Sequence, residues 1–317
     1  MTEKQILNYD MIILGGGPAG LSAAIYATRG TVKTAIIDIS MIGGQPANYL
    51  EIENYPGFSL SGGFELMEKF EEHADKFGVD KFPMEEIAKV ELDKDEKIVE
   101  TTNKIFKSKA IVLATGAKAQ KLGIPGETEL AGRGVSYCAV CDGAFFKEKV
   151  VTVVGGGNAA VEEALYLTKF ASKVRIIHRR DQLRADKILQ DRAFSNPKLE
   201  IIWDTVPLEI KGEDKVSSIM LKNVKTNEIF ELTTDGVFPY IGFAPNSELF
   251  NEKVNMDKTG FIITDINLAT NLPGVYAAGD MRVTPLRQVI TATADGAIAA
   301  TSAIKYLETI ESRVLKG

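Results

Sequence analysis

The sequence predicts an α/β protein in which two parallel-sheet domains share one plan and one domain is inserted into the other. Three observations support this prediction. A short apolar strand leads into a glycine-rich turn at residues 15–20, and the same pattern returns at residues 155–160. Each turn is followed by a helical pattern and a second apolar strand. Two further strand patterns ending in glycine lie on either side of the second copy.

The first copy occupies residues 10–38 and contains every part of a βαβ unit. We expect strands at residues 11–14 and 34–37, joined by a helix whose buried face includes residues 21, 24, 25 and 28. The second copy has predicted strands at residues 150–154 and 174–177 around a helix of the same apolar spacing. The sequence therefore predicts two Rossmann-like domains.

The small residues in both turns are spaced as in pyrophosphate-binding turns. The first glycine permits the tight turn, the second lets a phosphate approach the backbone, and a small third residue allows close packing of helix and strand. The helix start then offers free N–H groups and a partial positive charge. A glycine-rich turn without a ligand is the alternative. The expected binding residues are Gly15, Gly17, Pro18, Ala19 and Gly20 in the first copy, and Gly155, Gly157, Asn158, Ala159 and Ala160 in the second.

The residue that ends the second strand differs between the copies, and this difference predicts two different nucleotides. Asp38 ends the first copy, where an acid accepts a hydrogen bond from a ribose 2′-hydroxyl and repels a 2′-phosphate. That suits FAD or NAD. The second copy has His178, Arg179 and Arg180, with Arg184 one helical turn further on. Arginines bind a phosphate through paired, charge-assisted hydrogen bonds, so this copy favours NADPH. A solvated basic strand end is the alternative.

The only two cysteines, Cys138 and Cys141, form a Cys-x-x-Cys motif shortly before the second glycine turn. This spacing brings two sulfurs together in an easily reduced ring and lowers a thiolate pKa. Zinc would need four ligands, and only two histidines, both distant in sequence, could add to the pair. A purely structural disulfide across two residues would remove little loop entropy. We therefore expect a redox-active pair and no metal, with Asp142 as the acid–base group for thiol exchange or, alternatively, as a helix cap.

With these motifs, the whole chain resembles the low-molecular-weight, bacterial type of thioredoxin reductase. The resemblance implies the two-dinucleotide-binding flavoprotein fold, with Cys141 facing the flavin and Cys138 attacking the disulfide of thioredoxin or a thioredoxin-like protein. It also implies a homodimer. The matching segments are Gly15-x-Gly17-x-x-Gly20, Gly43-Gly44-Gln45, residues 53–57, residues 138–143, His178-Arg179-Arg180 to Arg184-Ala185, residues 277–280 and Arg287-Gln288.

The same resemblance implies a discontinuous FAD domain. Its parts would be residues 1–117 and 246–317, and the NADPH domain with the cysteine pair would be residues 118–245. Thr115-Gly116 and Gly279-Asp280 end two further strands of the FAD domain, and Asp280 would bind the ribityl chain. The helix beginning near residue 287 would meet the flavin pyrimidine, where its dipole stabilises anionic charge. The implied FAD residues are thus Gly43, Gly44, Gln45, Asn54, Thr115, Gly116, Gly279, Asp280, Arg287, Gln288 and Val289.

Composition limits the other function classes. The chain has 317 residues, 45% of them hydrophobic, and a net charge of −6. No basic stretch favours nucleic acid, and no apolar run approaches the roughly 20 residues that span a bilayer. The first ten residues are polar, without the basic and apolar order of a signal peptide. We therefore expect a cytoplasmic protein with neither nucleic-acid nor membrane partners.

Two departures from the family pattern leave alternatives open. The usual Gly-Asp-Ser-Ala of the second turn is here Gly157-Asn158-Ala159-Ala160, and Leu183 replaces a phenylalanine. The lost polar groups could weaken NADPH binding or mark another electron donor. The alternatives are a related enzyme using ferredoxin or another thioredoxin-like acceptor, a non-catalytic flavoprotein, and a reductase of the ferredoxin–NADP type.

Overall fold

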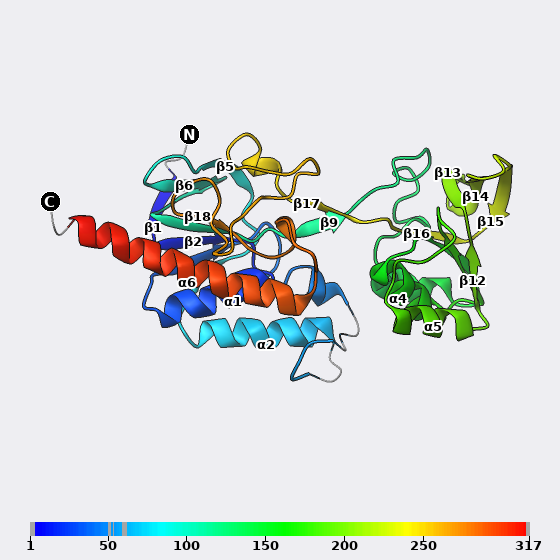
Figure 1. Ribbon diagram of the computed structural model, residues 1–317, viewed down its shortest axis with the longest axis horizontal. Coiled ribbons are helices and arrows are strands. Elements are labelled where there is room, and N and C mark those ends of the chain that lie inside the picture. Colours follow the sequence, from blue (N-terminus) through cyan, green and yellow to red (C-terminus); the bar gives the residue numbers. More distant parts are fainter. Residues whose placement is uncertain (1–3, 50–51, 53, 59–61, 315–317) are drawn as a thin grey trace. The chain divides into compact units, whose positions relative to one another are not determined.

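The computed structural model describes residues 4–49, 52, 54–58 and 62–314, without the side chains of residues 140, 141, 313 and 314. The chain divides into two compact units (Figure 1). Unit 1 comprises Met1–Lys118 and Ala244–Gly317, and unit 2 comprises Ala119–Phe243. The predicted α/β class with two Rossmann-like folds is confirmed by the parallel sheet in each unit.

Unit 1 is built on a five-stranded parallel sheet in the order β18-β8-β2-β3-β4. These strands are β2 (Met11–Leu14), β3 (Thr34–Ile37), β4 (Asp80–Phe82), β8 (Ala110–Leu113) and β18 (Val275–Ala277). A second sheet has the order β1-β7-β6-β5, formed by β1 (Gln5–Asn8), β5 (Ile87–Glu91), β6 (Lys97–Thr101) and β7 (Lys104–Ser108). Both faces of β2 are buried, as in other parallel sheets.

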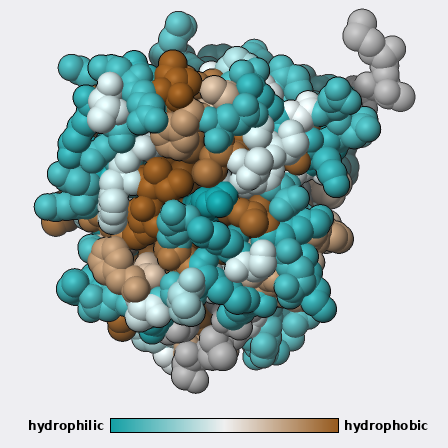
Figure 2. Space-filling model, turned by 90° about the vertical axis from the view of Figure 1, so that its right-hand side faces the viewer, coloured by the Kyte–Doolittle hydropathy of each residue, from teal (hydrophilic) through white to brown (hydrophobic). Residues whose placement is uncertain are grey.

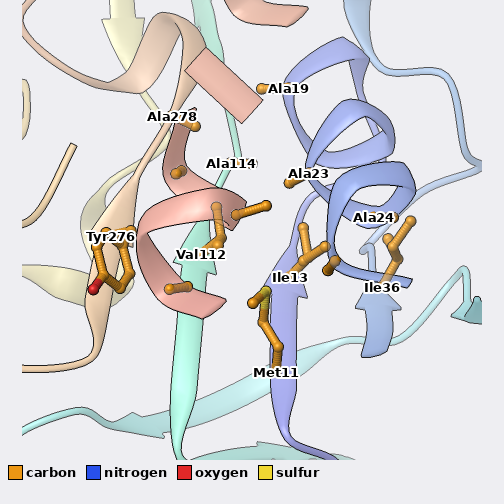
Figure 3. Packing of buried hydrophobic residues seen from close by; sticks show 14 of the residues in the cluster. Met11, Ile13, Ala19, Ala23, Ala24, Ile36, Val112, Ala114, Tyr276 and Ala278 are labelled. Carbon is orange, nitrogen blue, oxygen red and sulfur yellow. The ribbon is translucent and has the colours of Figure 1, made fainter. Parts of the chain in front are cut away.

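Three helices accompany the parallel sheet of unit 1: α1 (Pro18–Arg29), α2 (Gly63–Asp75) and α6 (Val289–Val314). Figure 3 shows Met11, Ile13 and Val112 of the sheet packed near Ala23 and Ala24 of α1. Helix α6 also packs closely on α1, because a Cβ at Gly296 would lie only 2.1 Å from the Ala19 carbonyl oxygen. Helix α6 begins two residues after the predicted start near residue 287. Short 3-10 turns lie at η1 (Gln45–Asn48), η3 (Glu248–Phe250) and η4 (Gly279–Met281).

Unit 2 has a four-stranded parallel sheet in the order β12-β11-β10-β16. Its strands are β10 (Val150–Gly155), β11 (Lys173–Ile177), β12 (Leu199–Ile202) and β16 (Gly236–Tyr240). An antiparallel sheet of β13 (Thr205–Gly212), β14 (Val216–Asn223) and β15 (Ile229–Thr233) packs beside it around Ile219 and Leu221. The helices are α3 (Ala139–Asp142), α4 (Asn158–Leu167) and α5 (Lys187–Ser195), with the 3-10 turn η2 (Gly143–Phe146).

The two places where the chain passes between the units are neighbouring strands. β9 (Ala117–Ala119) and β17 (Phe243–Pro245) pair in a two-stranded sheet. Within unit 1, the Asn246 amide N–H donates to the Gly116 carbonyl at 3.0 Å and the Thr115 hydroxyl donates to the Asn246 carbonyl at 2.7 Å. Both crossing segments are therefore fixed to each other where they leave unit 1.

The surface view in Figure 2 shows a mostly hydrophilic face with apolar residues gathered near its middle. Scattered apolar surface is ordinary for a folded protein. Among the exposed apolar side chains, Phe145 is 74% exposed and lies in the turn that follows the cysteine motif. None of the described helices is both long enough and apolar enough to span a bilayer.

Candidate active site

The first glycine turn contains two glycines that the fold itself requires and one that it does not require. Gly15 has a φ of 108°, and a Cβ there would lie 2.2 Å from the Ala114 carbonyl oxygen. A Cβ at Gly20 would lie 1.8 Å from the Gly15 oxygen. At Gly17, by contrast, the nearest atom would be 3.7 Å away and φ is −79°. The chain's own packing therefore leaves room at Gly17, as expected where a pyrophosphate approaches the backbone.

The loop with Gly43 and Gly44 lies directly against this turn. The Gly43 amide donates to the Gly16 carbonyl at 2.9 Å, and a Cβ at Gly44 would lie 2.9 Å from the Gly17 Cα. Gln45 follows as the first residue of η1. Of the predicted segment 53–57, Glu53 lies outside the described residues.

The predicted flavin residues near α6 are brought together across the sequence. The side-chain amide of Asn54 donates from Nδ2 to the side-chain oxygen Oε1 of Gln288 at 2.9 Å. Gln288 immediately precedes Val289, the first residue of α6. Arg287 lies over the Phe261 ring at 4.1 Å and donates from Nε to the Asp280 carbonyl at 3.3 Å. These residues thus converge at the helix start, where the resemblance places the flavin.

Gly279 and Asp280 stand beside the start of α1. A Cβ at Gly279 would lie 3.0 Å from the Ala19 Cβ, and the Gly279 amide donates to Asp295 at 3.0 Å. Arg282 holds the same carboxylate with two bonds, from Nε at 2.6 Å and from Nη2 at 2.9 Å. Burial raises the pKa of Asp280 to about 6, an effect that Arg287 opposes. The Thr115 hydroxyl donates to the Asn246 carbonyl at the crossing segment, and the expected contact of Thr115 with the flavin stays a prediction.

Asp38 holds the first glycine turn in place. One carboxylate oxygen accepts the Gly16 amide N–H at 2.6 Å, and the other accepts the Ser40 amide and hydroxyl at 2.8 and 2.9 Å. Each oxygen of an ionised carboxylate has two acceptor sites, so a ribose hydroxyl can still bind. The sequence predicted the ligand role but not this structural role.

The second glycine turn repeats the geometry of the first. A Cβ at Gly155 would lie 2.3 Å from the Tyr240 carbonyl oxygen, whereas a Cβ at Gly157 would meet no atom within 4 Å. Gly157 precedes α4, so open space again lies at the helix start. Asn158 exchanges two hydrogen bonds with Asp186, from Nδ2 to Oδ2 at 2.7 Å and from the Asp186 amide to Oδ1 at 2.8 Å. Ala159 follows it, and Ala160 is buried against Gly155.

The predicted binding residues after β11 differ in exposure, because one is buried and the others face solvent. His178 is 4% exposed, its Nε2 lies 2.9 Å from the Gln182 carbonyl oxygen, and burial lowers its pKa. Its ring also fills the space at Gly156, where a Cβ would lie 2.3 Å from it. The structure therefore turns His178 inward, away from the phosphate-contacting role that the sequence suggested. Arg179, Arg180 and Arg184 are exposed, and their guanidinium groups form no ion pair within the described part of the chain.

Cys138 is disulfide-bonded and precedes the short helix α3. Its amide donates to the Ser136 hydroxyl at 3.1 Å, and its carbonyl accepts the Asp142 amide at 3.1 Å. Asp142 makes no side-chain cap for the turn that follows, which removes the alternative role of capping η2. The side chain of Cys141 lies outside the described residues, so its pairing with Cys138 stays a prediction.

Two tyrosines hold this segment from either side, and sequence reasoning missed both. Tyr137 donates to Glu127 at 2.7 Å, and Glu127 also accepts the amides of Leu122 and Gly123. On the other side, the Ala139 amide donates to the Tyr240 hydroxyl at 2.9 Å. A tyrosine directly before a Cys-x-x-Cys motif is visible in the sequence, but its partner residues are not.

One unit therefore contains both the disulfide-bonded Cys138 and a predicted nucleotide-binding turn, and the other unit contains a second predicted nucleotide-binding turn. Cysteine thiolates exchange with disulfides through a mixed disulfide, which suits redox transfer. Within the described residues, no group of three or more histidines, cysteines and carboxylates could hold a metal ion.

Comparisons with known proteins agree with this geometry. A model of the pyridine nucleotide-disulphide oxidoreductase family matches residues 9–296. The chain is 50% identical to a thioredoxin reductase of Peptoclostridium acidaminophilum, over 95% of this chain and 97% of that protein. It is 49% identical to a thioredoxin reductase of Bacillus subtilis, over 98% of each. The crystal structure of Lactococcus lactis thioredoxin reductase in its FR conformation is 47% identical, with a TM-score of 0.92 over 95% of this chain and 99% of that chain.

Proposed function

The chain belongs to the pyridine nucleotide-disulphide oxidoreductase family, and we propose that it is an NADPH-dependent thioredoxin-disulfide reductase. The observation that carries this proposal is the disulfide-bonded Cys138 in the unit that also holds the second glycine turn. The relatives of highest identity reported above are thioredoxin reductases, which supports thioredoxin or a thioredoxin-like protein as the acceptor.

FAD fits the first turn and NADPH fits the second. The room at Gly17 and Gly157 suits two pyrophosphates, and Asp38 suits a free ribose hydroxyl. When bound, FAD would take a hydride from NADPH and supply two electrons to the disulfide. The exposed Arg179, Arg180 and Arg184 would bind the 2′-phosphate. A ferredoxin donor would have no use for this row of arginines, so the structure favours NADPH.

The chain's own residues carry the exchange with thioredoxin. The Cys138 thiolate attacks one sulfur of the thioredoxin disulfide and expels the other as a thiolate. Cys141, as a thiolate, then attacks Cys138, which restores the Cys138–Cys141 disulfide and releases the second thioredoxin sulfur. Asp142 lies one residue beyond Cys141 and is half-buried, where it can protonate the leaving thiolate.

The surroundings of the cysteine motif also suit a protein substrate. Phe145 is 74% exposed and lies four residues after Cys141 in the sequence. Exposed aromatic side chains of this kind are typical of protein-binding surfaces. We further propose that the protein acts as a homodimer in the cytoplasm. Sedimentation velocity at micromolar concentration should then give the mass of two chains.

Replacing either cysteine tests the relay. Cys138→Ser and Cys141→Ser should each abolish thioredoxin reduction, because the exchange needs both a nucleophile and a resolving thiol. NADPH should still bleach the flavin absorbance in both variants, which serves as the internal control for folding and cofactor binding. Full turnover in either variant would exclude the disulfide relay. A colourless, folded wild-type protein without flavin affinity would exclude FAD.

A further inference from the structure

Glu163 is a buried acid that the proposed reaction does not use. It lies on α4 and is 6% exposed, and its Oε2 has no hydrogen-bond partner within the described structure. A buried carboxylate with an unpaired oxygen is costly, so such a group is usually protonated or has a specific task. Burial raises the pKa of Glu163 to about 7, helped by the nearby charge of Glu162 and opposed by a hydrogen bond from Tyr240.

Tyr240 connects this acid to the cysteine motif. Its hydroxyl accepts the Ala139 amide N–H at 2.9 Å and bonds to the Glu163 carboxyl. A tyrosine hydroxyl has one proton, and an amide can only donate to its oxygen. The hydroxyl proton is therefore the group that Tyr240 donates to Glu163 when that carboxyl is ionised. Ala139 follows Cys138 directly, and α3 packs on α4, so the chain of bonds is short.

We propose that Glu163 is a positioning residue for Cys138, acting through Tyr240 and the Ala139 amide, so that protonation of Glu163 changes the reactivity of the Cys138 thiol. This inference rests on the proposed function, in which Cys138 is the nucleophile. Ionised Glu163 brings a negative charge close to α3 and engages the Ala139 N–H through Tyr240. Both effects disfavour a thiolate at Cys138. Protonation of Glu163 removes this charge. The neutral Glu163 carboxyl can then donate to the Tyr240 hydroxyl instead of accepting from it.

Other charged residues lie on α4 and on the elements packed against it. Among them, Glu162 is the one whose charge raises the pKa of Glu163. β10 and β16 contribute no charged side chain, and β16 contributes only the Tyr240 hydroxyl. The remaining charged residues on the elements packed against α4 are Asp142 on α3, Lys173 and Arg175 on β11, and Lys187, Asp191 and Arg192 on α5.

The test measures the Cys138 thiol directly. In a Cys141→Ser background Cys138 is the only cysteine, and the flavin-loaded full chain is reduced and then alkylated with iodoacetamide between pH 5.5 and 9. The Cys141→Ser parent, in which Glu163 and Tyr240 are intact, should show a broad profile, because Glu163 ionises near neutral pH and disfavours the Cys138 thiolate. Glu163→Gln should give a simple single-step profile, with a rate near pH 8 roughly threefold higher, as expected when a nearby like charge is removed. Tyr240→Phe should change the profile in the same direction, since loss of the Tyr240 donor raises the pKa of Glu163 further and breaks its link to the Ala139 amide.

Tyr137→Phe is the matched control. It removes a hydroxyl from the other side of Cys138, but its partner Glu127 keeps two backbone donors. Its profile should remain that of the parent. The proposal is overturned if Glu163→Gln and Tyr240→Phe keep the parent profile, or if Tyr137→Phe shifts it equally. Alkylation needs neither NADPH nor thioredoxin, so these outcomes are separate from failure of the proposed reductase activity.

Discussion

The two glycine turns share one frame but differ at the residue that ends the following strand. In unit 1, Asp38 reaches back and accepts the Gly16 amide at 2.6 Å. In unit 2, the equivalent His178 packs its ring against Gly156, and the Arg184 amide donates to the Gly156 carbonyl at 2.7 Å. The middle glycine of each turn is thus held from the same place by different chemistry.

The difference concerns two tasks, supporting the glycine turn and recognising the ligand. As proposed, unit 1 assigns both tasks to the residue that ends the second strand, whereas unit 2 divides them among several residues. Asp38 supports its turn, and under the proposed function it would also present a negative charge to the ligand. In unit 2 the buried His178 supports the turn, and the proposed function assigns ligand selection to the exposed Arg179, Arg180 and Arg184. If these arginines bind a phosphate as proposed, the turn needs a separate support, since an arginine pointing at phosphate cannot also fill the space beside Gly156.

The largest expected effect tests whether the two glycine turns tolerate the same residue at their third small position, which is Gly20 in unit 1 and Ala160 in unit 2. Gly20→Ala should destabilise the protein by about 3 kcal/mol and release flavin, because its Cβ would lie 1.8 Å from the Gly15 oxygen. The matched change in the other copy, Ala160→Gly, should cost only about 1 kcal/mol through helix propensity. Denaturant unfolding and bound-flavin absorbance provide the measurement. Equal losses in both variants would mean that the turns do not differ here.

The next effect concerns ligand selection. Arg179→Ala and Arg180→Ala should raise the KM for NADPH far more than that for NADH, by roughly 10- to 150-fold, the value of a charged hydrogen bond of about 1.5–3 kcal/mol. Arg133→Ala, an exposed arginine elsewhere in unit 2, is the control and should leave both constants unchanged. If the two cofactors were affected alike, these arginines would not recognise the 2′-phosphate.

The smallest effect is a pH dependence that only the second turn should show. Burial lowers the pKa of His178 below its ordinary value of 6.5. Neutral His178 therefore contributes its full stabilisation of the folded state at pH values above 6.5. That stability is lost as pH falls through the lower folded pKa. Between pH 7 and 5 the thermal midpoint of the wild type should therefore drop by about 2 °C more than that of His178→Gln. Parallel curves for the two proteins would show that His178 is not held neutral.

Much of the frame could be predicted because it depends on local patterns. The strands at residues 11–14 and 34–37 have their predicted bounds, and β10 and β11 extend theirs by one residue each. The inward turn of His178 could not be predicted, because it depends on space beside Gly156 and on a carbonyl at Gln182. The same holds for Tyr240, whose partner Ala139 lies 101 residues away. Sequence spacing indicates which residues follow a strand, but packing decides which way they point.

The paired strands β9 and β17 bear on how this molecule could have been assembled. Because the chain leaves and re-enters unit 1 through adjacent strands, the two cut ends of unit 1 are neighbours. A short turn from β9 to β17 would close unit 1 without disturbing its parallel sheet. An ancestral gene could therefore have gained or lost the whole of unit 2 in a single insertion or deletion, and the reading frame of unit 1 would have remained that of a complete domain.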